Sequence, residues 1–254
     1  MEVHAHSSPA SGGAHTPRKK WTHYFWEFLM LFLAVFCGFF AEYQLEHKIE
    51  KDREKQFIRS LVNDLEADTT RLTEIIMTRN TRESRLDSIS FLLNGDAAPR
   101  FTNDLYYYAV FVSRGISIRY VPNDGTMQQL KNAGGLRLVH SRFIADSITR
   151  YDVSVRSLVK QGDIEEVSLQ EYRTIAHKFF DARIFDTMMD ANNNPSPPSD
   201  NPGLFPYTMS DLHDFNYKLF TVKAFNRANR RDARKLLHQA ENLIVALKKE
   251  YHLE

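Results

Sequence analysis

The chain has 254 residues, with 33 lysines and arginines against 32 aspartates and glutamates, and one cysteine, Cys37. This length allows one sizeable domain with a core of its own. The near-zero net charge gives no electrostatic case for a nucleic-acid partner, and a lone cysteine excludes an intrachain disulfide. Glycine and proline are few, with ten and nine residues, which favours helices.

Residues 1–17 are small and polar, and a basic cluster, Arg18-Lys19-Lys20, follows them. Together residues 1–20 predict a disordered tail. Residues 21–43 then predict a transmembrane helix. Their uncharged core, Phe28–Ala41, is bracketed by Glu27 and Glu42, and 23 residues of helix span roughly 34 Å at about 1.5 Å per residue. Aromatic rings suited to the membrane interfaces lie in the flanks, at Trp21, Tyr24, Trp26 and Tyr43.

This segment is expected to be an uncleaved anchor. Cleavage after Ala41 would put Phe39 where a signal peptidase needs a small residue, and bulky Phe36 precedes Cys37 where a lipoprotein site would lie. The cluster before the span favours a cytoplasmic N-terminus, although basic residues also follow the span. The expected location is therefore the inner (cytoplasmic) membrane, crossed once, with the large domain in the periplasm.

Residues 44–56 are mostly charged and predict a solvated helical stalk. From Phe57 apolar residues recur at three- and four-residue steps as far as Leu93, where Asn94-Gly95 indicates a helix end. A break near Thr78–Arg82 is an alternative within this long helix.

The next segments are shorter. Leu105–Val112 suits either a strand or a helix, and a helix is favoured because Leu105, Tyr108, Ala109 and Val112 share one face. A short helix is expected at Thr126–Ala133, closed by Gly134-Gly135.

Two further helices complete the chain. One begins after Ser141 and continues as an apolar pattern towards Asp190. A Pro-rich linker follows at 191–207, and Ser210 is expected to cap the last helix. The predicted fold is all-α: an N-terminal transmembrane helix that continues into a long stalk helix and then an antiparallel helical bundle over residues 57–254.

Two stretches resemble a known family. The run SLVNDLEADTTRL at Ser60–Leu72 and the run LKNAGGLRLVHSRFIADSITRYD at Leu130–Asp152, after a Glu-containing span, resemble a family of uncharacterised bacterial single-pass membrane proteins with a helical extramembrane domain. The resemblance covers most of the chain to about residue 152. It implies an N-terminal anchor and a helical domain, and it supplies no activity or catalytic residue.

One face of the span carries small and polar residues: His23, Glu27, Ala34, Gly38 and Ala41. Ala34-x-x-x-Gly38 lets two helices approach closely, and Glu27 is costly in lipid unless it pairs or reaches the interface. The hypothesis is a contact face for self-association or for a partner helix. In the alternative, Glu27 lies at headgroup level and the small residues face lipid.

A basic run on the last helix is a second candidate, with Arg227, Arg230, Arg231, Arg234 and Lys235 able to dock an acidic partner or lipid headgroups. The alternative, which is favoured because Ala228 and Ala233 interrupt the run, is the solvated face of an amphipathic helix. Neither His177 with Asp181 nor His238 with Glu241 is accompanied by the further carboxylates that a di-iron bundle needs, so no metal or cofactor is expected. No hydrolase or phosphate-loop motif is present.

These features predict a non-enzymatic, membrane-anchored interaction or scaffold protein. Its expected partners are the lipid bilayer and either further copies of the chain or another membrane protein. The alternative is a ligand-binding, sensor-like helical domain that signals through a partner, with a pocket in the Tyr106–Tyr120 region.

Overall fold

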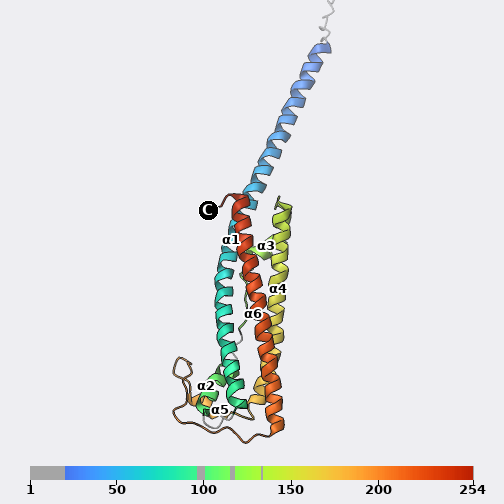
Figure 1. Ribbon diagram of the computed structural model, residues 1–254. Coiled ribbons are helices and arrows are strands. Elements are labelled where there is room, and N and C mark those ends of the chain that lie inside the picture. Colours follow the sequence, from blue (N-terminus) through green and yellow to red (C-terminus); the bar gives the residue numbers. More distant parts are fainter. Residues whose placement is uncertain (1–20, 96–100, 115–117, 133, 254) are drawn as a thin grey trace, which may run out of the picture. The chain divides into compact units, whose positions relative to one another are not determined.

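The computed structural model describes residues 21–95, 101–114, 118–132 and 134–253, so the predicted tail at 1–20 lies outside the described residues. The described residues form helices and no named strand, which confirms the all-α fold (Figure 1). The elements, in chain order, are α1 (Trp21–Asn94), α2 (Thr102–Ser113), α3 (Gly125–Asn132), the 3-10 helix η1 (Gly135–Arg137), α4 (Arg142–Ala176), α5 (Ala182–Thr187) and α6 (Met209–Tyr251).

The chain divides into two compact units, Met1–Asp52 and Arg53–Glu254. The described part of the first unit is the N-terminal part of α1. It contains an 18-residue window with a mean hydropathy of 1.9, none of which is buried, and α1 is the one described helix long and apolar enough to cross a membrane. Stacked phenylalanines line one side of it, with ring centroids 6.0–6.3 Å apart, at Phe28, Phe32, Phe36 and Phe40.

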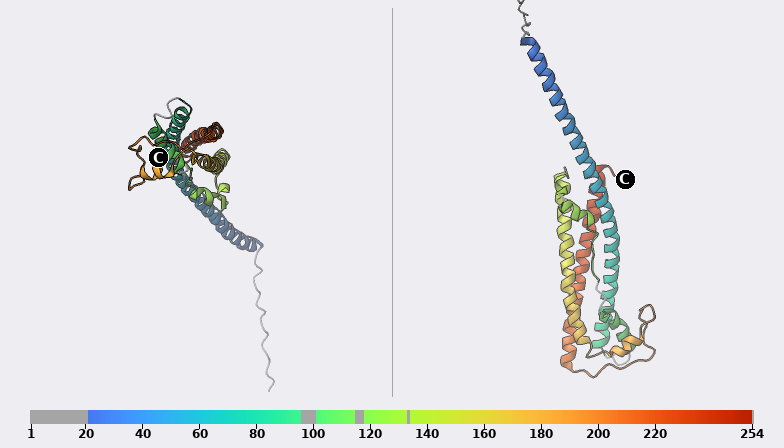
Figure 2. Two further views of the ribbon diagram at one scale, coloured as in Figure 1. Left: turned by 90° about the horizontal axis from the view of Figure 1, so that it is seen from below. Right: turned by 180° about the vertical axis from the view of Figure 1, so that it is seen from behind.

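The second unit is a bundle of three long helices: the remainder of α1, α4 and α6 (Figure 2). Contacts along their length give their directions. Asp68 and Arg79 of α1 contact Tyr151 and Glu165 of α4, in increasing order along both helices, so these two helices are parallel. The predicted helical bundle is confirmed, and α6 is its antiparallel member, because Lys248 pairs with Glu66 whereas Asn216 contacts Asn94.

The parallel pair is possible because the chain passes back along the bundle after α2. Residues 118–124 have no regular structure, and α3 and η1 then join the core beside the start of α4. Gly134 takes the left-handed conformation, with φ of 67°, at the entry to η1. A side chain at Gly134 would be strained, and a Cβ at Gly135 would lie 3.0 Å from Cδ2 and 3.1 Å from Cα of Leu130, so the two glycines have separate reasons.

Each long helix presents a regular seam to the others. Buried residues recur at alternating four- and three-residue steps on α1 from Glu54 to Leu93, on α4 from Ile144 to Ala176 and on α6 from Phe215 to Leu247. This is the spacing of the core positions of a coiled coil. The unbroken seam agrees with a continuous α1, so the break considered near Thr78–Arg82 is absent.

The apolar seam residues form two separate clusters. The first joins α1 around Ile58–Leu72 to α3, to the first half of α4 and to the second half of α6. The second joins the end of α1 to α2, to the end of α4 and to the start of α6. Between them the seam positions of all three helices hold polar side chains.

Two helix boundaries differ from the sequence prediction. The last helix begins at Met209, two residues before the start that a cap at Ser210 would give, because Thr208 is its N-cap. The Thr208 hydroxyl accepts a hydrogen bond from the Asp211 amide, and the Asp211 carboxylate accepts one from the Thr208 amide. The helix after Ser141 ends at Ala176, and the chain turns at Phe179 and Phe180 into the short helix α5.

Candidate functional site

The candidate site is a polar layer that crosses the bundle between its two apolar clusters. Arg79 and Arg82 come from α1, Glu165 comes from α4, and Asn226 and Asn229 come from α6. All five are buried, and the Glu165 side chain is only 1% exposed. Each occupies a seam position of its helix, so the fold itself places these polar groups in the core.

Glu165 is the centre of this layer. Its carboxylate accepts hydrogen bonds from both Nη atoms of Arg79, at 2.9 and 2.8 Å, and lies 3.3 Å from Nη1 of Arg82. Asn229 donates its side-chain amide to the same carboxylate at 2.9 Å. Two-point pairing of this kind fixes the guanidinium plane, so one carboxylate locks α1, α4 and α6 in a single register.

The remaining members tie the layer to the backbone. Arg79 also donates to the Ile118 carbonyl at 2.7 Å, which fastens the segment after α2 to α1. Asn226 donates to the Arg79 carbonyl at 3.0 Å. Removing several charges from water is costly, and these additional bonds offset part of that cost.

Positive charge exceeds negative charge around the layer. Burial lowers the pKa of Arg82 to about 10, with Glu165 opposing the shift and Arg79 and Arg173 adding to it. Arg82 is still protonated at neutral pH. Arg173 pairs with Glu166 at 3.0 Å, yet its Nε and Nη2 atoms are buried without a partner in the described part of the chain. Three arginines thus share two glutamates, which leaves an excess of one positive charge.

A pocket of about 170 Å³ adjoins this layer on the side of α2. Arg82 is common to both, and the pocket is completed by Thr78 and Arg85 of α1, by Phe111 and Val112 of α2, and by Arg114 and Ile118. The guanidinium carbon of Arg85 lies 3.3 Å from the centre of the Phe111 ring. Such an arrangement of protonated guanidinium groups can bind an anion.

Sequence reasoning missed both the layer and the arginines of the pocket. The signal was present as spacing: extending the three- and four-residue steps of the apolar stripe past Ile75 leads to Arg79 and Arg82 before Leu86. Arg79 and Arg82 are missed when only apolar residues are assigned to the stripe.

The Tyr106–Tyr120 region, which the sequence suggested for a ligand pocket, is divided between the two apolar clusters. Tyr106 is fully buried against Phe180 and Phe185, and its hydroxyl accepts a hydrogen bond from the Asp181 amide at 2.9 Å. Tyr120 belongs to the other cluster, where its hydroxyl lies 3.4 Å from that of Tyr151. The tyrosines are core residues, and between them Phe111 and Arg114 line the pocket instead.

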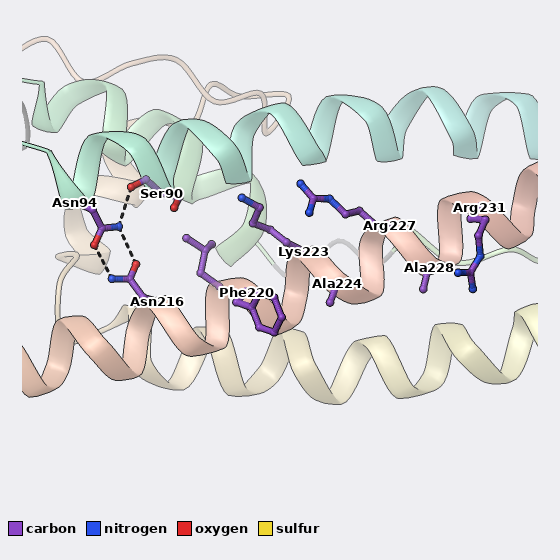
Figure 3. Close-up of a pocket in the computed structure, with 10 residues that line it drawn as sticks. Ser90, Asn94, Asn216, Phe220, Lys223, Ala224, Arg227, Ala228 and Arg231 are labelled. Carbon is purple, nitrogen blue, oxygen red and sulfur yellow. Dashed lines mark hydrogen bonds between the residues drawn. The ribbon is translucent and has the colours of Figure 1, made fainter.

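A shallower groove of about 570 Å³ runs along the outside between α1 and α6 (Figure 3). Asn94 and Asn216 close one end, where their side-chain amides exchange two hydrogen bonds of 2.9 and 2.6 Å. Exposed Phe220 lies in the groove, and its other end is lined by Arg227 and Arg231.

The basic residues of α6 lie beside acidic side chains of the same bundle. Arg227 and Arg230 both pair with Glu83 of α1, and Arg231 and Lys235 flank Asp232. Arg234 is exposed on the same helix. A docking role for these five residues stays a prediction, although most of their charge is already partnered within the bundle.

The small-residue face of the first unit lies opposite the phenylalanine ridge. At about 100° per residue the mean directions of the two sets differ by about 180°. His23 Nε2 lies 3.2 Å from Glu27 Oε1, and both side chains are about half exposed. Ala34, Gly38 and Ala41 are exposed, and a Cβ added to Gly38 would meet nothing within 4 Å.

The two histidine pairs named from the sequence are not part of a larger cluster of metal-ligand side chains in the described residues. Among the described residues no three histidine, cysteine, aspartate or glutamate side chains are grouped to hold an ion. His238 and Glu241 are exposed partners 3.3 Å apart.

The fold and site thus define a class: an all-α bundle with a buried charged layer and an N-terminal helix that is apolar enough to cross a membrane. Comparison with family models, with curated proteins and with solved structures gives no match.

Proposed function

We propose that this chain is a membrane-anchored helical interaction protein that works as a homo-oligomer or as a subunit of a membrane complex. The observation that carries the proposal is the exposure of the apolar side chains around the whole circumference of α1 between Trp21 and Tyr43. A helix that is apolar all round requires an apolar surrounding. The bundle provides its own core, which leaves lipid or a partner helix as the surrounding of this segment.

The proposed arrangement has one crossing of the inner membrane, with the N-terminus in the cytoplasm and the bundle in the periplasm. Trp21, Trp26 and Tyr43 stand near the two ends of the apolar segment, where aromatic rings favour the interfaces. The bacterial setting rests on the family resemblance of the sequence.

Membrane extraction tests the anchor. We expect the full chain to stay with membranes in alkaline carbonate and to be released by detergent, whereas a variant lacking residues 2–43 is recovered in the soluble fraction. Release of the full chain by carbonate would contradict an anchor and would indicate that the apolar helix is covered by protein.

Cysteine labelling tests the orientation. In a Cys37→Ser background, single cysteines are placed in the tail, as Ser8→Cys, and on the exposed surface of the bundle, as Gln239→Cys. A membrane-impermeant maleimide applied to intact spheroplasts is expected to label the bundle position only. Labelling of the tail position alone would reverse the proposed orientation.

The small-residue face is the proposed contact surface within the membrane. Because a larger side chain at Gly38 meets nothing in its own chain, any effect of Gly38→Ile on mass reports contact with another helix. We expect Gly38→Ile with Glu27→Leu to lower the mass of the detergent-solubilised particle. Phe36→Ile, on the opposite ridge, is the matched control and should leave the mass unchanged. An unchanged mass in both variants would remove this face from the proposal.

A ligand-sensing role is the second candidate, and one observation favours it. The pocket beside the charged layer contacts α1, α2 and the segment that follows α2, so a bound ligand would bridge elements that are distant in sequence. The nature of that ligand can be inferred further.

A further inference from the structure

We propose that the pocket lined by Arg82, Arg85, Arg114 and Phe111 is a binding site for a small oxyanion. Three guanidinium groups reach this pocket from two different segments, and none of its described lining residues is acidic. The inference goes beyond membrane anchoring. The site lies wholly within the bundle unit, so it holds or fails independently of how the N-terminal helix meets the membrane.

The charge of the surroundings supports an anionic ligand. Arg79, Arg82 and Arg173 face Glu165 and Glu166 in the adjoining layer, and Arg85 and Arg114 add two further positive charges. Glu165 is already engaged by Arg79, Arg82 and Asn229. Unlike the exposed arginines of α6, these groups are held close together with too few carboxylates to balance them. A bound anion would supply the missing negative charge.

The guanidinium group of Arg114 also lacks one acceptor among the described residues. The Nε atom of Arg114 is buried and has no hydrogen-bond partner in the described part of the chain. Burial lowers the pKa of Arg85, and the neighbouring Arg114 lowers it further, against the opposing effect of Tyr107. Guanidinium groups carry a positive charge at neutral pH. An oxyanion between them would accept these hydrogen bonds and relieve the repulsion.

The arginines are positioned before any ligand arrives. Arg85 stacks on Phe111 at 3.3 Å, and Arg114 lies 5.9 Å from the same ring. Arg82 is fixed by its pairing with Glu165. Groups held in place by packing lose little freedom on binding, which is the usual condition for recognising a small, highly hydrated ion.

The volume limits the ligand to a small one. A cavity of about 170 Å³ corresponds to about five or six water molecules at roughly 30 Å³ each, which is room for phosphate, sulfate or a two-carbon carboxylate together with water. Guanidinium groups recognise tetrahedral and planar oxyanions by the same paired hydrogen bonds. A tricarboxylate such as citrate is much larger than phosphate and leaves less room for the water that accompanies a hydrated ion.

The test uses the full chain in detergent, purified without phosphate or sulfate and kept at constant ionic strength with sodium chloride. Calorimetric titration and thermal unfolding are measured with phosphate, sulfate, acetate and citrate. We expect saturable binding of phosphate or sulfate with a rise in Tm, and weaker binding of citrate. Stronger binding of acetate than of phosphate would assign the site to planar carboxylates. Absence of saturable binding of all three small anions would overturn the proposal.

Matched variants locate the binding. Arg85→Gln with Arg114→Gln should weaken phosphate at least tenfold, whereas Arg227→Gln with Arg231→Gln, in the outer groove, should leave the affinity unchanged. Far-UV circular dichroism checks the fold. If the first pair does not fold, Arg85→Lys serves instead: it retains the charge and loses the planar fork, so the affinity should fall while the helix content stays constant. Equal affinity in all folded variants would place the anion elsewhere and refute the site.

Discussion

The two parts of α1 differ in which side chains they expose and which they bury. Between Trp21 and Asp52 the apolar side chains are exposed. Between Arg53 and Asn94 most apolar side chains are buried in the seam, although Met77 and Phe91 are exposed, and four charged ones are buried with them: Glu54, Asp68, Arg79 and Arg82. One continuous helix of 74 residues thus contains both arrangements.

The difference shows what each part needs from its surroundings. Among the described residues of its own unit the first part has no partner helix, and its apolar side chains stay exposed. The second part has two partner helices, and its buried charges are matched by specific groups on α4, on α6 and in the connecting segments. Buried polar residues at seam positions restrict register at a cost in stability, which is the role we assign to the layer at Glu165.

The largest expected effect comes from removing the centre of that layer. Glu165→Leu leaves Arg79 and Arg82 buried without their carboxylate, which should destabilise the bundle by about 3–5 kcal/mol. Denaturant unfolding followed by circular dichroism measures the loss.

A compensated variant separates charge from packing. Glu165→Leu combined with Arg79→Met and Arg82→Met removes all three charges and should recover most of the lost free energy of unfolding, because a well-packed apolar layer can replace a buried ion network. A loss below about 1 kcal/mol in the single variant would mean that the layer is solvated in solution and does not hold the register.

An identical substitution in the two parts of α1 gives the next largest effect. Leu72 is fully buried in the first cluster, and Leu72→Ala should destabilise the bundle by about 2–5 kcal/mol. Leu31 is 68% exposed, and Leu31→Ala should change the free energy of unfolding of the bundle by no more than about 0.5 kcal/mol. Comparable losses from both substitutions would break the comparison, because they would require the apolar N-terminal segment to support the bundle.

The N-cap of α6 gives a smaller effect, and it tests the boundary at which the structure, with Thr208 as cap, differs from the predicted cap at Ser210. Thr208→Ala removes the hydroxyl that accepts from the Asp211 amide and should cost about 1 kcal/mol. Ser210→Ala lies one residue inside the helix and should have little effect. Thermal unfolding of the two variants side by side decides between the caps. The reverse order would restore Ser210 as the cap.

Much of this fold follows from spacing alone. The apolar steps of α1, α4 and α6 predict three long helices with a common core, and Asn94-Gly95 marks the end of α1 correctly. The short helices α2 and α3 also agree with the expected segments. These features are local, since periodicity and helix-end residues act within a few turns.

The charged layer could not be predicted from the sequence of any one helix alone. Arg79 reads as a surface residue until Glu165, 86 positions later, is known to face it. The passage of residues 118–124 back along the bundle, which makes α1 and α4 parallel, likewise depends on long-range contacts such as that of Arg79 with the Ile118 carbonyl. The arginines of the pocket come together only because α2 packs against α1. The chemistry of the pocket is therefore visible only in three dimensions.

The smallest expected effect concerns Asp68, a buried seam carboxylate that lies outside the main layer. Burial raises its pKa, and hydrogen bonds from the Asn123 amide, from Tyr120 and from Tyr151 only partly oppose the shift. The phenols of Tyr120 and Tyr151 have pKa values raised by burial, so they stay protonated and can donate.

The sign of its pH dependence follows from that shift. A raised pKa means that the folded state holds the proton more tightly than the unfolded state, so the contribution of Asp68 becomes more favourable as the pH falls through the folded pKa. The free energy of unfolding of the wild type minus that of Asp68→Asn should therefore be larger at about pH 4.5 than at about pH 7. Other carboxylates titrate alike in both proteins and cancel in this difference. A difference that shrinks on acidification would show that the hydrogen bonds outweigh burial, and that this part of the seam accommodates a charge as readily as the exposed surface does.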